Sequence, residues 1–233
     1  MIVLPPSFPA TRESLPAVAC YAVGPARKAE TGLIGLRSWA WGYATPPFAD
    51  GTRITVEGDT LTRRDGRSHP LRTVAEAAGF LEVVPSPDPG VGRDLPPFIP
   101  DEPLAIDVEA SHALGAWYAF GQLLLEELAR RSPPGVVTEP QLWPEHFDLA
   151  AVVTMGPGSG GARVVNVGCS PGDAYLDEPY LYVGPHDRSK LDGPFWNTPF
   201  GAALPRSGLG TSSEAERLGI EFLSRGLELV ARP

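Results

Sequence analysis

The sequence is poor in cysteine and contains no long run of hydrophobic residues. Only two of its 233 residues are cysteines, Cys20 and Cys169, which is too few for a disulfide framework and favours a reducing compartment. No stretch of about 18 apolar residues occurs, so a membrane-spanning helix is not expected. The start of the chain, MIVLPPSFPATRES, lacks the basic and apolar regions of a signal peptide. We therefore expect a cytoplasmic protein.

Positive charge is also sparse. The chain carries 19 Lys and Arg against 28 Asp and Glu, for a net charge of −9, and its sequence shows no basic cluster larger than a pair. Nucleic acids and anionic membranes are bound by clustered positive charge, so neither is an expected partner. Lys28 and Lys190 are the only lysines. The preference for Arg, together with abundant Ala, Pro and Gly, is typical of a GC-rich bacterial genome.

Hydrophobic residues, prolines and glycines are plentiful. Hydrophobic residues make up 42% of the chain, which also has 27 prolines and 26 glycines, so we expect a folded, turn-rich protein with short elements. We interpret 1–233 as a single α+β unit. It has possible sub-halves 1–84 and 104–233, joined by a Pro-rich connection at 85–103.

Residue periodicity predicts an antiparallel β-sheet built from both halves, with two helices packed on it. The long middle helix is expected at 107–131, with Leu124 and Leu128 on its buried stripe. The C-terminal helix is expected at 213–230, with Ser213-x-x-Glu216 as its capping box.

Shorter elements are expected on either side of the long helix. A first helix begins at Ser14 and ends or kinks at Gly24-Pro25. A strand covers 33–43, and a meander with two hairpin turns covers 53–71. In the C-terminal half, four strands are expected at 147–155, 162–169, 180–184 and 195–204.

Two glycine-containing motifs resemble catalytic or phosphate-binding loops. The segment GCSPG at 168–172 matches a nucleophile elbow, but Pro171 has no N–H to offer an oxyanion and no helix is expected to follow. We therefore interpret Ser170 as part of a turn. The loop at 156–161 is glycine-rich, but a strand follows it and no lysine lies near, so we expect a hairpin loop.

The histidines raise the possibility of a metal site. His146 and His186 flank expected strands, and Asp187 follows the second of them. Imidazole and carboxylate groups together are good metal ligands, but the spacing of these residues does not bring them together. The alternative is a pair of hydrogen-bonded histidines at strand ends. If the two strands are neighbours, both histidines are expected to line one cleft with Trp143 or Tyr182.

Aromatic residues are dense between 143 and 200. A sheet surface lined with aromatic and polar groups can bind a ligand, although the same residues can form the core beneath a helix. The candidate ligand-binding residues are Trp143, His146, Tyr180, Tyr182, His186 and Trp196.

Three segments carry a resemblance to known sequences: LWPEHFDLA at 142–150, NVGCSPGDAYLDEPYLYVGPHD at 166–187 and FWNTPFGAALP at 195–205. Together they resemble an uncharacterised, mostly actinobacterial protein family of similar length. More distantly, the chain is similar to a bacterial domain-of-unknown-function family with W-P-x-x-F-D-L-A and E-P-Y-x-Y motifs. The resemblance implies a shared architecture and supplies no catalytic residues.

These observations favour a non-catalytic protein that binds a small molecule or a protein partner in an aromatic-lined site of its C-terminal half. The alternative is a metal-assisted hydrolase, or another enzyme, that uses His146 and His186. A third reading is an interaction protein with no pocket, which would expose a large apolar patch. The sequence implies no cofactor, and it leaves the oligomeric state open.

Overall fold

The structure is a computed structural model that describes residues 2–93, 95–133, 135–158, 161–189 and 191–232. The chain divides into two compact units. The N-terminal unit comprises Ile2–Ala119 and Gln141–Asp148, and the C-terminal unit comprises Phe120–Pro140 and Leu149–Pro233. Each unit contains helices and antiparallel strands, so the expected α+β class is confirmed.

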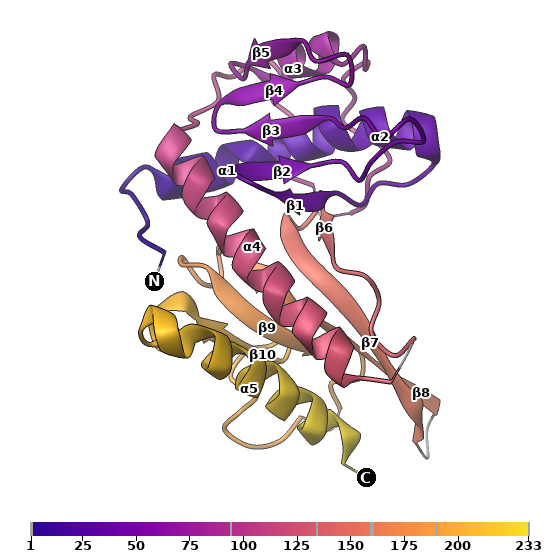
Figure 1. Cartoon of the computed structure of the whole chain (residues 1–233), viewed down its shortest axis with the longest axis vertical. Coiled ribbons are helices and arrows are strands. Elements are labelled where there is room, and N and C mark those ends of the chain that lie inside the picture. Colours follow the sequence, from indigo (N-terminus) through magenta and orange to yellow (C-terminus); the bar gives the residue numbers. More distant parts are fainter. Residues whose placement is uncertain (1, 94, 134, 159–160, 190, 233) are drawn as a thin grey trace. The chain divides into compact units, whose positions relative to one another are not determined.

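The N-terminal unit begins with one continuous helical stretch, drawn in indigo in Figure 1. It consists of α1 (Phe8–Val18), the π-helical turn η1 (Ala19–Val23) and α2 (Gly24–Thr31). The predicted start at Ser14 is wrong, because the Ser14 hydroxyl accepts the Ala105 N–H instead of capping a helix. Gly24-Pro25 does not end the helix either, because the π-helical turn η1 leads directly into α2, in which the proline lies within the first turn.

The N-terminal sheet contains five antiparallel strands in sequential order. They are β1 (Arg37–Trp39), β2 (Gly42–Ala44), β3 (Thr55–Glu57), β4 (Thr60–Thr62) and β5 (Ser68–Pro70). The predicted meander at 53–71 is confirmed, and Gly58-Asp59 forms the expected hairpin turn between β3 and β4. The single strand expected at 33–43 is wrong. It is a hairpin in which Trp39 pairs with Gly42, and Trp41 adopts a φ of 66° in the turn.

The Pro-rich segment contributes to the core of the N-terminal unit. Val91 is fully buried, and the Phe98 ring meets the Tyr21 ring edge-on at 5.0 Å. Helix α3 (Val74–Phe80), capped by the Thr73 hydroxyl, packs nearby. The cluster consists of Cys20, Tyr21, Val74 and Val91, with Ala17, Ile34, Leu95, Phe98 and Leu104 packed against it.

The long helix α4 (Val108–Arg131) confirms the helix expected at 107–131. Its first half belongs to the N-terminal unit, where Gly115 lies directly against the backbone of Trp41 and Gly42. The Asp107 carboxylate caps it by accepting the Ala110 N–H at 2.9 Å.

The segment after α4 returns to the N-terminal unit. There, Leu142 of β6 (Gln141–Trp143) exchanges both backbone hydrogen bonds with Leu36.

The C-terminal unit contains an antiparallel sheet with the strand order β10-β9-β8-β7. Its strands are β7 (Asp148–Gly158), β8 (Gly161–Ser170), β9 (Tyr180–Pro185) and β10 (Ala202–Pro205). The first three confirm the strands predicted at 147–155, 162–169 and 180–184. Part of the loop predicted at 156–161 lies outside the described residues. The fourth is shorter than the predicted 195–204. The Asn197 side-chain amide bonds both backbone groups of Ala203, and these bonds take the place of a longer ladder.

Two helices cover one face of the C-terminal sheet. Helix α5 (Ser212–Ala231) follows the 3₁₀ turn η2 (Arg206–Leu209). Three glycines permit the close packing of these helices. Gly121 of α4 lies against Cys169 of the sheet, and in α5 Gly219 lies against Leu124 and Leu181 while Gly226 lies against Val183. As expected, Leu124 and Leu128 are buried, with 3% and 4% exposure.

The cap predicted at Ser213 and Glu216 is wrong by two residues. The Glu214 carboxylate accepts both the backbone N–H and the hydroxyl of Thr211, so the capping box begins there.

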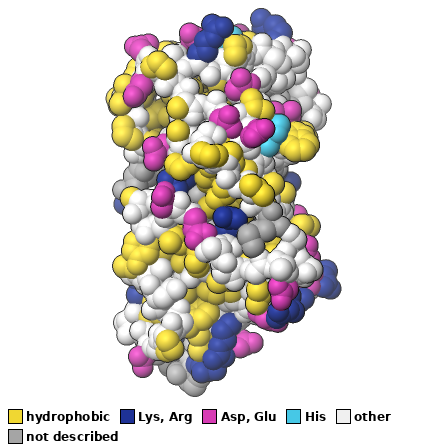
Figure 2. Space-filling model, turned by 90° about the vertical axis from the view of Figure 1, so that its left-hand side faces the viewer, with side chains coloured by type: hydrophobic (Ala, Val, Ile, Leu, Met, Phe, Trp, Pro, Cys, Tyr) yellow, Lys and Arg dark blue, Asp and Glu magenta, His cyan; other side chains and the backbone are white. Residues whose placement is uncertain are grey.

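The surface mixes charged and apolar groups. On the face drawn in Figure 2, acidic side chains are interspersed with hydrophobic ones over both units. Among the described residues, no helix has the length and apolar character needed to cross a membrane.

Candidate functional site

The strongest candidate site lies on the open face of the C-terminal sheet, the face opposite α5. Side chains alternate between the two faces of a strand. Leu181 and Val183 of β9 point toward Gly219 and Gly226 of α5. Tyr180 and Tyr182 therefore lie on the other face of the sheet.

On this open face, Tyr180, Tyr182 and Phe200 form an aromatic cluster. The three ring centroids are 6.2 to 6.4 Å apart, and Tyr175 meets Phe200 at 5.5 Å. Tyr180 is 4% exposed and Tyr175 is 53% exposed, whereas Tyr182 and Phe200 are partly exposed. The cluster thus grades from buried to solvent-facing, and part of its aromatic surface is accessible.

Gly168 sets the position of the Tyr182 ring. The two residues are paired across β8 and β9. A Cβ added at Gly168 would lie 2.9 Å from two ring carbons of Tyr182 and 2.5 Å from the Leu149 carbonyl oxygen. Only a glycine lets the ring lie this close to the strand. The ring therefore rests on the backbone of β8.

Polar groups border the aromatic cluster. His186 lies 3.1 Å from the Asn166 side-chain oxygen, and Asn166 precedes Gly168 by two residues on the same face of β8. On another side, the Tyr180 hydroxyl donates to the Asp173 carboxylate at 2.6 Å. Asp173 also accepts two backbone N–H groups of its own loop, from Tyr175 and Leu176. This face therefore offers ring surfaces beside an amide–imidazole pair.

Ser170 is arranged as a turn residue. Its hydroxyl accepts the Gly172 N–H at 3.1 Å, and the residues between Ser170 and β9 contain no helix. A nucleophile elbow requires a strand that turns sharply into a helix. The backbone geometry of an elbow is thus missing at this serine.

The predicted site residues are divided between the two units. Tyr180 and Tyr182 lie together. Trp196 packs edge-on against Phe195, which contacts Phe222 of α5. Trp143 and His146 belong to the N-terminal unit.

Of the proposed metal ligands, His146 belongs to the N-terminal unit, and His186 and Asp187 belong to the C-terminal unit. His186 is bonded to Asn166, and Asp187 accepts both the N–H and the hydroxyl of Ser189. Among the described residues, no group of three His, Cys, Asp or Glu side chains is placed to hold a metal ion. A cleft shared by His146 and His186 remains a prediction.

Three contributors to the open face were absent from the predicted set: Gly168, Asn166 and Phe200. A glycine within a strand is a signal for close approach of another group, and this signal could have identified Gly168. The positions of Asn166 and Phe200 depend on strand register and on the loop before β10, which periodicity does not specify.

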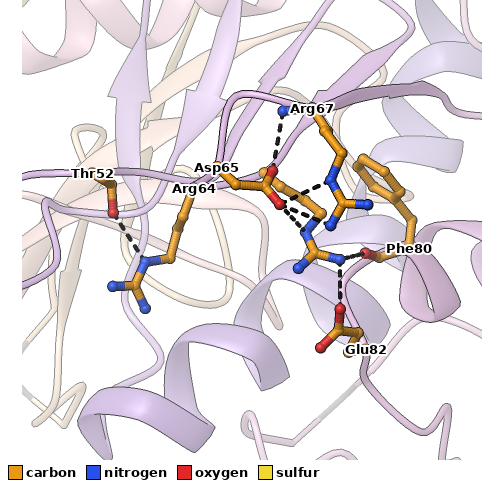
Figure 3. A network of polar contacts seen from close by, with 7 residues as sticks. Thr52, Arg64, Asp65, Arg67, Phe80 and Glu82 are labelled. Carbon is orange, nitrogen blue, oxygen red and sulfur yellow. Dashed lines mark hydrogen bonds and ion pairs between the residues drawn. The ribbon is translucent and has the colours of Figure 1, made fainter.

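A polar network in the N-terminal unit contains three arginines, and these are paired with carboxylates of the same unit (Figure 3). Arg63 pairs with Glu82 at 2.8 Å, and Arg67 pairs with Asp65 at 2.8 Å. Arg64 pairs with Asp50 at 2.7 Å and with Glu30 at 2.8 Å. These ion pairs join the β4–β5 turn to neighbouring segments, so the network is suited to a structural role.

A groove of about 340 Å³ separates the second half of α4 from α5. Leu123, Leu124 and Ile220 contribute apolar surface, while Glu127, Arg131, Glu216, Arg217 and Glu221 supply charges of both signs. Several of these charges are paired with each other, as Arg131 is with Glu127 at 2.6 Å. The rim of the groove thus combines apolar side chains with charged side chains that partly neutralise each other.

Comparison of the chain with models of protein families found no match. Neither the curated proteins nor the solved structures contain a match to it.

Proposed function

We propose that the C-terminal unit is a non-catalytic binding module for a small, flat, largely apolar molecule that carries a hydrogen-bonding group. The observation that carries the proposal is the Tyr182 ring. It rests on Gly168, on the sheet face opposite α5, remains partly exposed and lies beside Phe200.

An aromatic ring held against a rigid strand suits a flat ligand. A second ring stacks on it or meets it edge-on, with a gain of about 0.5–1.5 kcal/mol beyond the burial of apolar area. Because Tyr182 is fixed by Gly168 and Phe200, little side-chain freedom is lost when a ligand binds.

The neighbouring polar pair supports specificity. Asn166 and His186 are bonded to each other and retain further donor and acceptor positions on the amide and the imidazole. A ligand with one polar group over this pair and its apolar body on Tyr182 would satisfy both surfaces. This division is typical of small-molecule sites.

Binding accounts for the geometry better than catalysis does. The enzyme alternative requires histidine and carboxylate groups that converge on one accessible point. In the described structure, His186 and Asp173 are each held by separate hydrogen-bond partners.

A fragment-binding experiment tests the proposal. A set of fluorinated aromatic carboxamides and phenols is screened against the full chain by ¹⁹F NMR, and hits are measured with Tyr182→Leu. We expect about two- to tenfold weaker binding, the equivalent of one lost aromatic contact. Phe195→Leu is the matched control, because this partly exposed ring packs toward α5 instead. Equal losses in both variants, or no hits at all, would contradict the proposal.

A further inference from the structure

A second binding site is indicated in the N-terminal unit by a buried arginine. Arg27 of α2 is 8% exposed. Its Nε atom is buried and has no hydrogen-bond partner in the described structure. Burial of a charged group is costly unless the charge is paired. This arginine thus differs from Arg64, which is more exposed and has two carboxylate partners.

The nearest acid on the same helix is already engaged. Glu30 lies one turn after Arg27, at a spacing that permits an ion pair within a helix. However, Glu30 pairs with Arg64 at 2.8 Å. The backbone carbonyl of Arg27 accepts a hydrogen bond from the Thr31 hydroxyl at 2.9 Å. This contact does not involve the guanidinium group.

A second positive charge, that of Arg37, acts on Arg27. The chain leaves α2 through Gly32, which adopts a φ of 73°, and returns at Arg37, the first residue of β1. Burial is the main cause that lowers the pKa of Arg27, and the charge of Arg37 lowers this pKa further. The two arginine charges therefore interact unfavourably with each other, and Arg37 is itself partly buried.

An uncharged donor lies beside the antiparallel bridge between Leu36 and Leu142. Leu36 and Leu142 exchange both backbone hydrogen bonds, and this antiparallel register sets Gln141 opposite Arg37. Opposite residues of such a pair project from the same face. The Gln141 amide lies over Gly35, where an added Cβ would be 1.8 Å from its Oε1 atom.

We propose that Arg27 and Arg37, with Gln141 beside them, form a binding site for a small oxyanion such as phosphate, sulfate or a ligand carboxylate. A planar guanidinium group binds such oxygens in a bidentate manner. The anion supplies the negative charge that Arg27 lacks, and so removes the penalty of its burial. This site is independent of the aromatic face of the C-terminal unit.

Inorganic phosphate and sulfate are the probes that test the site. Their binding to the full chain is measured by calorimetry and by thermal unfolding at constant ionic strength, with chloride as the reference salt and acetate as the carboxylate probe. We expect the oxyanions to raise the unfolding temperature above that in chloride. Arg27→Met should weaken binding about tenfold or more, as expected for the loss of a charged hydrogen-bonding partner.

Arg67→Met is the charge-matched control, because Arg67 is 65% exposed and paired with Asp65; it should leave phosphate binding unchanged. Without phosphate, Arg27→Met should raise the urea midpoint, because it removes a buried unpaired charge. If Arg27→Met does not fold, Arg27→Lys must still bind phosphate more weakly than the wild type. The inference is overturned if the wild type binds no oxyanion, if Arg27→Met binds equally, or if folded Arg27→Met has a lower urea midpoint.

Discussion

Replacement of Gly219 by alanine tests the packing between α5 and α4 in the C-terminal unit. The new methyl group would lie 2.6 Å from Leu124 Cδ1 and 3.1 Å from Leu181 Cδ1. Forcing a methyl group into a packed core costs about 1–3 kcal/mol. Alanine also recovers about 1 kcal/mol of helix propensity relative to glycine. The net expectation is a loss of about 0–2 kcal/mol in the free energy of unfolding.

A double-mutant cycle makes this expectation specific. Leu124→Ala alone should cost about 2–5 kcal/mol, because it leaves a cavity beside a side chain that is 3% exposed. It also removes the atom with which the new methyl group clashes. In the Leu124→Ala background, Gly219→Ala should therefore stabilise the protein by about 1 kcal/mol through helix propensity and partial filling of the cavity.

Urea unfolding of the four proteins measures the coupling energy, which we expect to be about 1–3 kcal/mol. Gly79→Ala on α3 serves as the control for sign, since an added Cβ there meets nothing within 4 Å, and it should stabilise by up to about 1 kcal/mol. If the effects of Gly219→Ala and Leu124→Ala add to within about 0.5 kcal/mol, the close contact between α5 and α4 is refuted.

Three further predictions follow from individual side chains. Ser170 should not react with a fluorophosphonate probe, because its backbone does not form a nucleophile elbow; labelling that is lost in Ser170→Ala would contradict this. Burial raises the pKa of the Cys20 thiol to about 12, and Cys169 is also buried. Both should therefore resist a thiol reagent at pH 8 until the protein is unfolded, and rapid labelling of either would count against the structure. Hydrogen bonds from Thr52, first among the causes, lower the pKa of Asp50 from its usual 3.8. The resulting stability is present above the unfolded pKa and is lost as pH falls through the folded pKa, so Asp50→Asn should flatten the acid limb of the stability profile; an unchanged limb would refute this assignment.

The sequence predicts the elements of this fold where one local pattern dominates. The helix at 107–131 has a long apolar stripe, and the turn at Gly58-Asp59 separates two alternating segments. Both therefore appear where they were expected. The strand predicted at 33–43 fails because it contains a tight turn at Trp41, a residue with no intrinsic preference for positive φ.

Tertiary contacts explain the other differences. The Asn197 side chain forms hydrogen bonds with the backbone N–H and C=O of Ala203. Part of the predicted fourth strand is therefore a loop. The segment Gln141–Asp148, which carries Trp143 and His146, belongs to the N-terminal unit, whereas the tyrosines of β9 belong to the C-terminal unit. Periodicity carries no information about such long-range returns of the chain.

The candidate site was predictable only in part. Alternation along β9 is sufficient to place Tyr180 and Tyr182 on one face. The contribution of Gly168 requires the register between β8 and β9, and that of Phe200 requires the path of a loop. Likewise, no local pattern distinguishes Arg27, whose buried Nε has no partner among the described residues, from Arg64, which is paired.

Mapping of a bound fragment by NMR tests the central claim most directly. Amide chemical shifts of the ¹⁵N-labelled full chain are recorded during titration with the tightest-binding aromatic fragment. The proposed site predicts that the largest changes occur at Asn166, Gly168, Tyr182 and Gly184 on the open face of the sheet. Changes confined to α5 and the second half of α4 would instead place binding in the groove between those helices, and would contradict the assignment of the aromatic face as the binding site.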